Sequence, residues 1–164
     1  AVSNWATFSQ GKADNSNRNQ ILNNTVSFTG AESMDIKEGT HAGIISGNKL
    51  DGSGMCWDKT STCNFADSMI DMKGQGWTVS GNTFAHMHTT WSSGTATNDG
   101  IQIHAISNTG SEGSGSGNTF ASNMLRDLGG YGCNVQSSDG GNISRCSNKV
   151  TGAGSGTGNV SGTD

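Results

Sequence analysis

The chain has 164 residues, of which 26 are glycine and none is proline, and only 30% are hydrophobic. Its net charge is −4 and it has no cluster of Lys or Arg, so we expect no nucleic-acid partner. No apolar run reaches the ~18–20 residues needed to cross a membrane. Low apolar content can indicate disorder, but a charged fraction of 13% and regular apolar alternation instead indicate one folded domain over residues 1–164.

In chain order, a polar lead-in over residues 1–19 precedes a series of expected strands, and a Gly/Ser-rich tail follows over 152–164. Gly, Asn and Ser fill the stretches between the strands, as is typical of turns that need a positive φ. Residues 124–127 are the one stretch that resembles a helical turn. The expected strands cover residues 19–28, 32–38, 41–50, 67–74, 75–88, 100–106, 116–128 and 131–137.

One four-residue pattern recurs along the chain, at residues 34–37, 70–73, 101–104 and 133–136. Its first and third positions are apolar in every copy, and its second and fourth are polar. This alternation is typical of a strand with one buried face. Successive copies are about 31–36 residues apart, a period that indicates a solenoid.

A second pattern consists of Asn, then Thr or Lys, then a large apolar residue. Two or more strands per unit of about 24–36 residues predict an all-β fold, a right-handed parallel β-helix of about five to six coils. In that fold the Asn side chains lie above one another and bond along a ladder. The predicted ladder comprises Asn24, Asn48, Asn82, Asn118 and Asn148.

Four cysteines, an even number, occur in this Gly/Ser/Asn-rich chain, which favours disulfides and a secreted, extracellular protein. The chain also begins at Ala1 without Met, as a mature product would after removal of a signal peptide. Three pairings are possible. We favour Cys56–Cys63, closing a long loop, and Cys133–Cys146, joining two neighbouring coils.

The polar positions of the four-residue pattern should face outward, because side chains alternate along a strand. They form two neighbouring rows with steps of about 4.8 Å between coils. The first row holds Asp35, Asp71, Gln102 and Asn134, and the second holds Lys37, Lys73, His104 and Gln136.

These rows allow two interpretations. One is a solvated Asp–Lys ladder that neutralises itself and contributes about 0.2–1 kcal/mol per pair. The other is a site for an acidic polysaccharide, in which carboxylates hold a divalent cation and a lysine removes a proton. A second ammonium nearby would lower the pKa of such a lysine. The proposed cation ligands, possible partners of Ca²⁺, are Glu32, Asp35, Asp67 and Asp71.

The run from Glu32 to Lys37 and the following Ile-Ile-Ser-Gly-Asn at residues 44–48 resemble the alginate lyase and chondroitinase B type of polysaccharide lyase. Those enzymes are right-handed β-helices in which a calcium-binding Glu lies five residues before a catalytic Lys, so the resemblance implies these roles for Glu32 and Lys37. Lys73 stands where the family has a catalytic Arg, which departs from the pattern. The resemblance implies that Lys73 serves as the charge stabiliser or as the acid. More broadly, residues 17–150 resemble the coils of secreted right-handed β-helix proteins.

Four side chains are candidates for sugar contacts: His104 and Gln102 in the outward rows, and Trp57 and Trp91 in loops. Trp77 begins a strand and is expected in the core. The alternative function is that of a non-catalytic extracellular effector recognised by a host receptor. Ice binding through Thr25, Thr83 and Thr119 is a third alternative, disfavoured by lysines that interrupt the row. We expect a monomer in each case.

Overall fold

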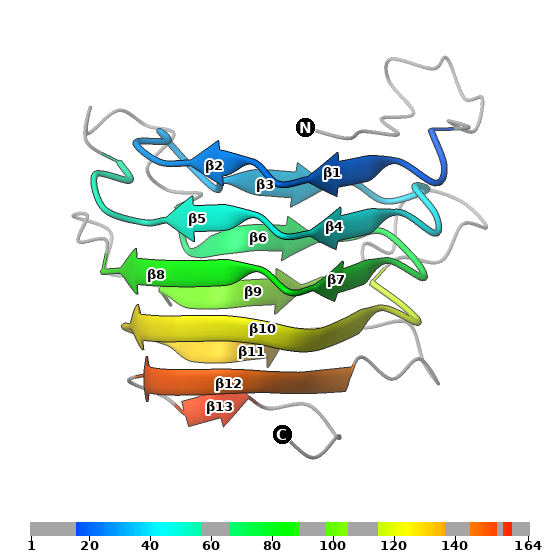
Figure 1. The fold of residues 1–164 in the computed structure, drawn as a ribbon. Helices are drawn as coiled ribbons and strands as arrows, with labels where there is room; N and C mark the ends of the chain where they lie inside the picture. Colours follow the sequence, from blue (N-terminus) through cyan, green and yellow to red (C-terminus); the bar gives the residue numbers. More distant parts are fainter. Residues whose placement is uncertain are drawn as a thin grey trace.

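The computed structural model describes residues 16–56, 66–88, 98–104, 115–136, 145–153 and 156–158. Every regular element among these residues is a strand, and every strand pair is parallel. In Figure 1 the chain crosses the front towards the left, returns behind towards the right and descends from coil to coil, which is a right-handed course. The predicted right-handed parallel β-helix is therefore confirmed.

The front sheet in Figure 1 has eight strands. In the first three coils each crossing is split into two short strands, whereas β10 and β12 run across the whole sheet. Its strands are β1 (Gln20–Leu22), β2 (Thr25–Val26), β4 (Ile44–Ser46), β5 (Lys49–Asp51), β7 (Thr78–Ser80), β8 (Thr83–Met87), β10 (Thr119–Leu128) and β12 (Arg145–Ala153).

The rear sheet has five strands, one for each coil, in the order β13-β11-β9-β6-β3. The Gly/Ser-rich tail contributes β13 to this sheet, beside Tyr131 and Cys133. The strands are β3 (Met34–Ile36), β6 (Ser68–Met72), β9 (Asp99–Ile103), β11 (Tyr131–Val135) and β13 (Gly156–Gly158).

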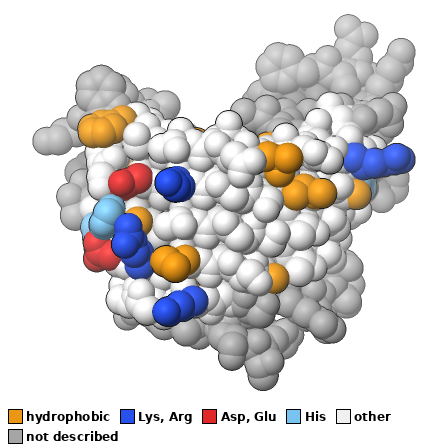
Figure 2. Space-filling view, in the orientation of Figure 1, with side chains coloured by type: hydrophobic (Ala, Val, Ile, Leu, Met, Phe, Trp, Pro, Cys, Tyr) orange, Lys and Arg blue, Asp and Glu red, His pale blue; other side chains and the backbone are white. Residues whose placement is uncertain are grey.

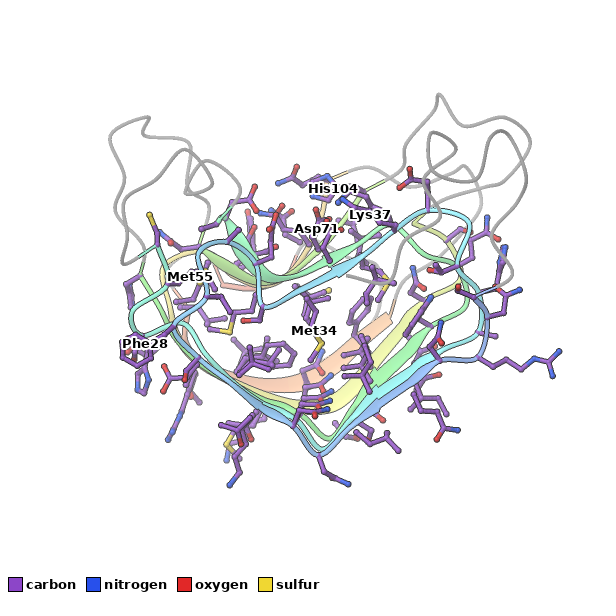
Figure 3. All side chains as sticks on the ribbon, turned by 90° about the horizontal axis from the view of Figure 1, so that it is seen from above. Phe28, Met34, Lys37, Met55, Asp71 and His104 are labelled. Atoms are coloured by element: carbon purple, nitrogen blue, oxygen red, sulfur yellow. The ribbon has the colours of Figure 1, made fainter. Side chains whose placement is uncertain are left out.

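The core is a column of apolar side chains between the two sheets, into which Met34 points in Figure 3. Parallel register places like residues above one another: Ile45, Val79 and Phe120 form one such row. Trp77 is fully buried, as expected, and its Nε1 donates to the Thr40 hydroxyl at 3.2 Å. Burying each large apolar side chain contributes about 1.5–3 kcal/mol, so repeated rows stabilise a chain with few hydrophobic residues.

The asparagine ladder is present, but one of its predicted members is wrong. In the fourth coil the ladder position is occupied by Asn123, not by Asn118. The side-chain oxygen of Asn123 accepts from the backbone N–H of Asn82 at 3.0 Å and from the side-chain amide of Asn82 at 2.9 Å. Asn118 lies immediately before the same long strand, one bend earlier, and its side-chain oxygen accepts from the backbone N–H of Trp77 at 2.8 Å.

The residue before each ladder asparagine has a positive φ in the first four coils, where the strand bends. Glycine adopts that conformation without steric cost, while Asn23 and Ser122 adopt it at some cost. The positive-φ residues are Asn23, Gly47, Gly81 and Ser122.

Two further expectations are corrected in the front sheet. Residues 124–127 are extended within β10, where Leu125 and Leu128 are buried, so the helical turn is wrong. Thr119 pairs with Thr78 rather than Thr83, so the threonine row proposed for ice binding does not exist. Figure 2 shows that uncharged polar side chains and backbone cover most of this face.

The cysteines are described in part. Cys56 and Cys133 are each disulfide-bonded, but Cys63 lies outside the described residues and the side chain of Cys146 is not described. The choice of partners therefore remains a prediction. Among the described residues, no helix is long and apolar enough to cross a membrane.

Candidate functional site

The two outward rows predicted from the sequence lie on the face of the rear sheet that points away from the core. Asp35 pairs with Asp71, Asp71 with Gln102, and Gln102 with Asn134, so the first row follows β3, β6, β9 and β11. The second row follows the ends of the same strands. Figure 3 shows Lys37, Asp71 and His104 gathered on this outer side, opposite Met34.

Backbone hydrogen bonds hold the second row in register. The N–H of Lys73 donates to Ile36 O at 2.7 Å, the N–H of His104 to Met72 O at 3.0 Å, and the N–H of Gln136 to Ile103 O at 3.0 Å. Each side chain of this row is thus fixed at its root one coil from the next, and neighbouring coils stack about 4.8 Å apart.

Asp35 and Asp71 are neutralised by lysines. Asp35 forms ion pairs with both Lys37 and Lys73, the latter at 3.2 Å, and Lys73 also contacts Asp71 directly. Burial alone would lower the pKa of Lys73, but the charges and hydrogen bonds of Asp71 and Asp35 outweigh it and raise that pKa. Lys73 therefore keeps its proton at neutral pH and is a fixed positive charge on the sheet.

His104 lies beside these ion pairs, with Nε2 at 2.9 Å from Gln102 Oε1 and 3.5 Å from Asp71 Oδ1. Its pKa is lowered because burial disfavours the charged ring, with a further contribution from the Lys73 ammonium. Asp71, Asp35 and Asp99 oppose that shift without reversing it. At neutral pH the imidazole is consequently uncharged, although a quarter of its side chain is exposed.

Asp99, which no sequence pattern indicated, is a fully buried acid beneath this site. Its Oδ2 accepts from Gln102 Nε2 at 2.9 Å and from Asn134 Nδ2 at 2.7 Å, and its Oδ1 accepts from the Tyr131 N–H at 2.6 Å. No repeat marks the position, because its counterpart on β6 is Ser68. Asp99 thereby fixes the amides of the first row.

Two further predicted acids lie just before their strands, Glu32 before β3 and Asp67 before β6. Burial, reinforced by the charge of Asp71, raises the pKa of Glu32 to about 7 and that of Asp67 to about 6. Asp35 acts on Glu32 in the same direction. Glu32 precedes the β3 strand and Asp71 lies on β6, so these acids belong to two neighbouring coils.

The four predicted calcium ligands do not fit a metal ion as they stand. Among the described residues, no three His, Cys, Asp or Glu side chains form a group that could hold a metal. Asp35 and Asp71, the central pair, already bind ammonium groups. Calcium therefore remains a prediction, and no chemical step below depends on it. The other predicted sugar contacts, Trp57 and Trp91, lie outside the described residues.

No protein-family model and no curated protein matches this sequence. A solved structure does match it, the alginate lyase from Paenibacillus sp. str. FPU-7, with a TM-score of 0.66 and 26% identity over 88% of this chain. The chain resembles an alginate lyase. It spans 44% of the length of that enzyme, so fewer than half of the enzyme's residues have a counterpart here.

Proposed function

We propose that this protein binds an acidic polysaccharide along the outer face of the rear sheet and cleaves it by β-elimination. The row of Lys37, Lys73 and His104, on three successive coils of a fold similar to an alginate lyase, carries the proposal. A polymer chain of charged sugars could follow such a row from coil to coil. Because such polymers lie in cell walls and matrices, the proposal also implies a secreted protein.

β-Elimination requires three events at the bond that is cleaved. The substrate carboxylate must be neutralised, the proton on the neighbouring carbon must be removed, and the leaving oxygen must receive a proton. Lys73 suits the first task, since its pKa is raised and its charge is held in place by Asp35 and Asp71. A preorganised positive charge of this kind stabilises the negative charge that develops on the substrate.

The remaining roles are the removal of the proton and the donation of a proton to the leaving oxygen. The resemblance to polysaccharide lyases assigns proton removal to Lys37. A lysine in that role needs a lowered pKa, which the repulsion of a second ammonium would provide. In the structure Asp35 bonds to both ammonium groups and offsets that repulsion. To Lys37, a quarter of whose side chain is exposed, we also assign the donation of a proton to the leaving oxygen.

The test is the ultraviolet absorbance of the unsaturated uronate that β-elimination produces. Alginate, pectate and chondroitin are each incubated with the folded protein, with added calcium and with a chelator. We expect a steady rise on at least one polymer, and a fall of about 10²-fold or more for Lys73→Met because the fixed charge is lost. Loss of the rise with chelator would support the calcium prediction.

A flat trace on all three polymers, from protein with an intact β-sheet circular dichroism spectrum, would contradict the proposal. It would favour the alternative of a non-catalytic effector. His88→Gln is the matched control, because His88 is exposed, follows β8 in the front sheet and pairs with Asp127. That variant should retain the wild-type rate.

A further inference from the structure

We propose that His104, in the tautomer protonated at Nε2, is the proton acceptor of this site, and that Asp99 and Gln102 are the positioning residues that fix this tautomer. The inference rests on the proposed function and deepens it. It assigns proton removal to Nδ1 of His104, whereas the family resemblance assigns it to Lys37.

The tautomer follows from the direction of the hydrogen bonds. Asp99 Oδ2 also accepts from Asn134, and the bond from Gln102 at 2.9 Å requires the NH₂ group of Gln102 to face the carboxylate. A second contact, from Gln102 Nε2 to the backbone oxygen of Asp67 at 3.4 Å, has the same polarity. Gln102 Oε1 therefore faces His104, and an amide oxygen can only accept.

His104 Nε2 must accordingly carry a proton, which it donates to Gln102 Oε1 at 2.9 Å. The same nitrogen faces Asp71 Oδ1, a buried carboxylate oxygen with no hydrogen bond, at 3.5 Å. A second acceptor on this side adds to the preference for Nε2–H. In the neutral ring the lone pair then lies on Nδ1, which has no hydrogen-bond partner among the described residues.

The charges around His104 suit this role. Asp71 and Lys73 act on the ring from the β6 coil, Asp35 from the β3 coil, and Asp99 from its own coil. Lys37 lies on the β3 coil, where it pairs with Asp35. Burial and the Lys73 ammonium together lower the pKa of His104, so the accepting nitrogen is unprotonated at neutral pH. In Figure 3 His104 and Lys37 lie on the same outer side of the sheet.

The step balances without any further reactant. Nδ1 takes the proton from the carbon beside the substrate carboxylate, and the electron pair of that C–H bond forms the new C=C bond. The adjacent C–O bond to the leaving sugar breaks, and its oxygen takes a proton from the Lys37 ammonium. His104 ends as imidazolium and Lys37 as neutral amine, and exchange with water restores both.

The direct test is NMR of protein labelled with ¹⁵N-histidine. We expect the His104 ring nitrogens to show Nε2 protonated and Nδ1 unprotonated at neutral pH, and to titrate below the reference histidine pKa of about 6.5. Gln102→Met, which is similar in shape but lacks the acceptor, should shift the ring towards a mixture of tautomers. A wild-type ring protonated at Nδ1 would overturn the proposal.

The kinetic test compares three variants on whichever polymer the wild type cleaves. His104→Gln should lower kcat/KM about 10²–10⁴-fold, the usual contribution of a general base, and Gln102→Met about 10-fold. His88→Gln should leave it unchanged. The wild-type kcat/KM should fall on the acid side at the pH where NMR shows His104 to titrate; a lysine base predicts a limb far above neutrality instead.

The outcomes separate the two proposals. If the wild type cleaves at least one polymer and His104→Gln is equally active on it, the role of His104 is overturned and the proposed function stands. A wild type with no lyase activity on any polymer would overturn both. Loss of activity in His104→Gln together with an Nε2–H ring in the wild type would support both.

Discussion

Among single residues, Lys73 is a charged group held between two carboxylates. Its ammonium pairs with Asp71 and Asp35, and only 12% of its side chain is exposed. Lys73→Met should therefore destabilise the fold by about 1–3 kcal/mol at pH 7, because it leaves Asp71 buried without its partner. Lys37→Met, which removes a more exposed ammonium paired with Asp35 alone, should cost at most about 1 kcal/mol.

The stability that the Lys73 ion pairs contribute should depend on pH. Its folded-state pKa is raised above 10.5, so its ion pairs stabilise the fold fully below that pH and are lost as pH rises through the folded-state value. Urea unfolding at pH 7 and in strong alkali should show the wild type losing more stability than Lys73→Met. Equal losses in the two proteins would contradict this account.

The charge of Glu32, unlike that of Lys73, destabilises the folded state. Burial raises its pKa to about 7 from 4.5, so the folded state favours the protonated acid and stability declines as pH rises between those values. Glu32→Gln removes the charge while keeping the shape. It should stabilise the protein by about 1–2 kcal/mol at pH 8, after allowance for solvent screening, and by almost nothing at pH 4. Chemical unfolding at both pH values measures the difference.

At the scale of the structural element, the asparagine ladder joins each coil to the next. Asn82 accepts from the backbone and side chain of Asn48 and donates to Asn123, Ile45 O and Ser80 O. Asn82→Ala should cost about 3 kcal/mol or more, since several buried groups lose their partners. Asn24→Ala, at the exposed first coil, should cost about 1 kcal/mol. Thermal unfolding would contradict the ladder's role if both variants lost equally little.

The ladder also shows how far sequence patterns reach. Asn48-Lys49-Leu50 and its relatives revealed the bend in four coils, because a polar residue follows the asparagine and an apolar one comes next. Asn123 is followed by Met124, an apolar residue that is 45% exposed, so the ladder residue of the fourth coil does not match the sequence pattern. Asn118 matches the sequence pattern, but it lies one bend before the ladder. Alternation identifies strands, but only pairing between coils decides which asparagine lies above which.

At the scale of the whole molecule, the fold and the two outward rows followed from the period of the sequence, and the chemistry of the site did not. Asp99 lies beneath Gln102 through tertiary contacts that no spacing encodes. The raised pKa values of Glu32 and Asp67 arise from burial between coils, which depends on the assembled solenoid. The pairing of Asp35 with two lysines likewise required two coils to stack in register.

The asparagine ladder has a direction. Each side-chain oxygen accepts from the asparagine of the preceding coil, and each amide donates towards the following one, from Asn24 to Asn148. The solenoid therefore has an acceptor end and a donor end, much as a helix has unlike termini. A further coil or a second copy added head to tail would prolong the ladder, whereas one added head to head would set like groups against each other.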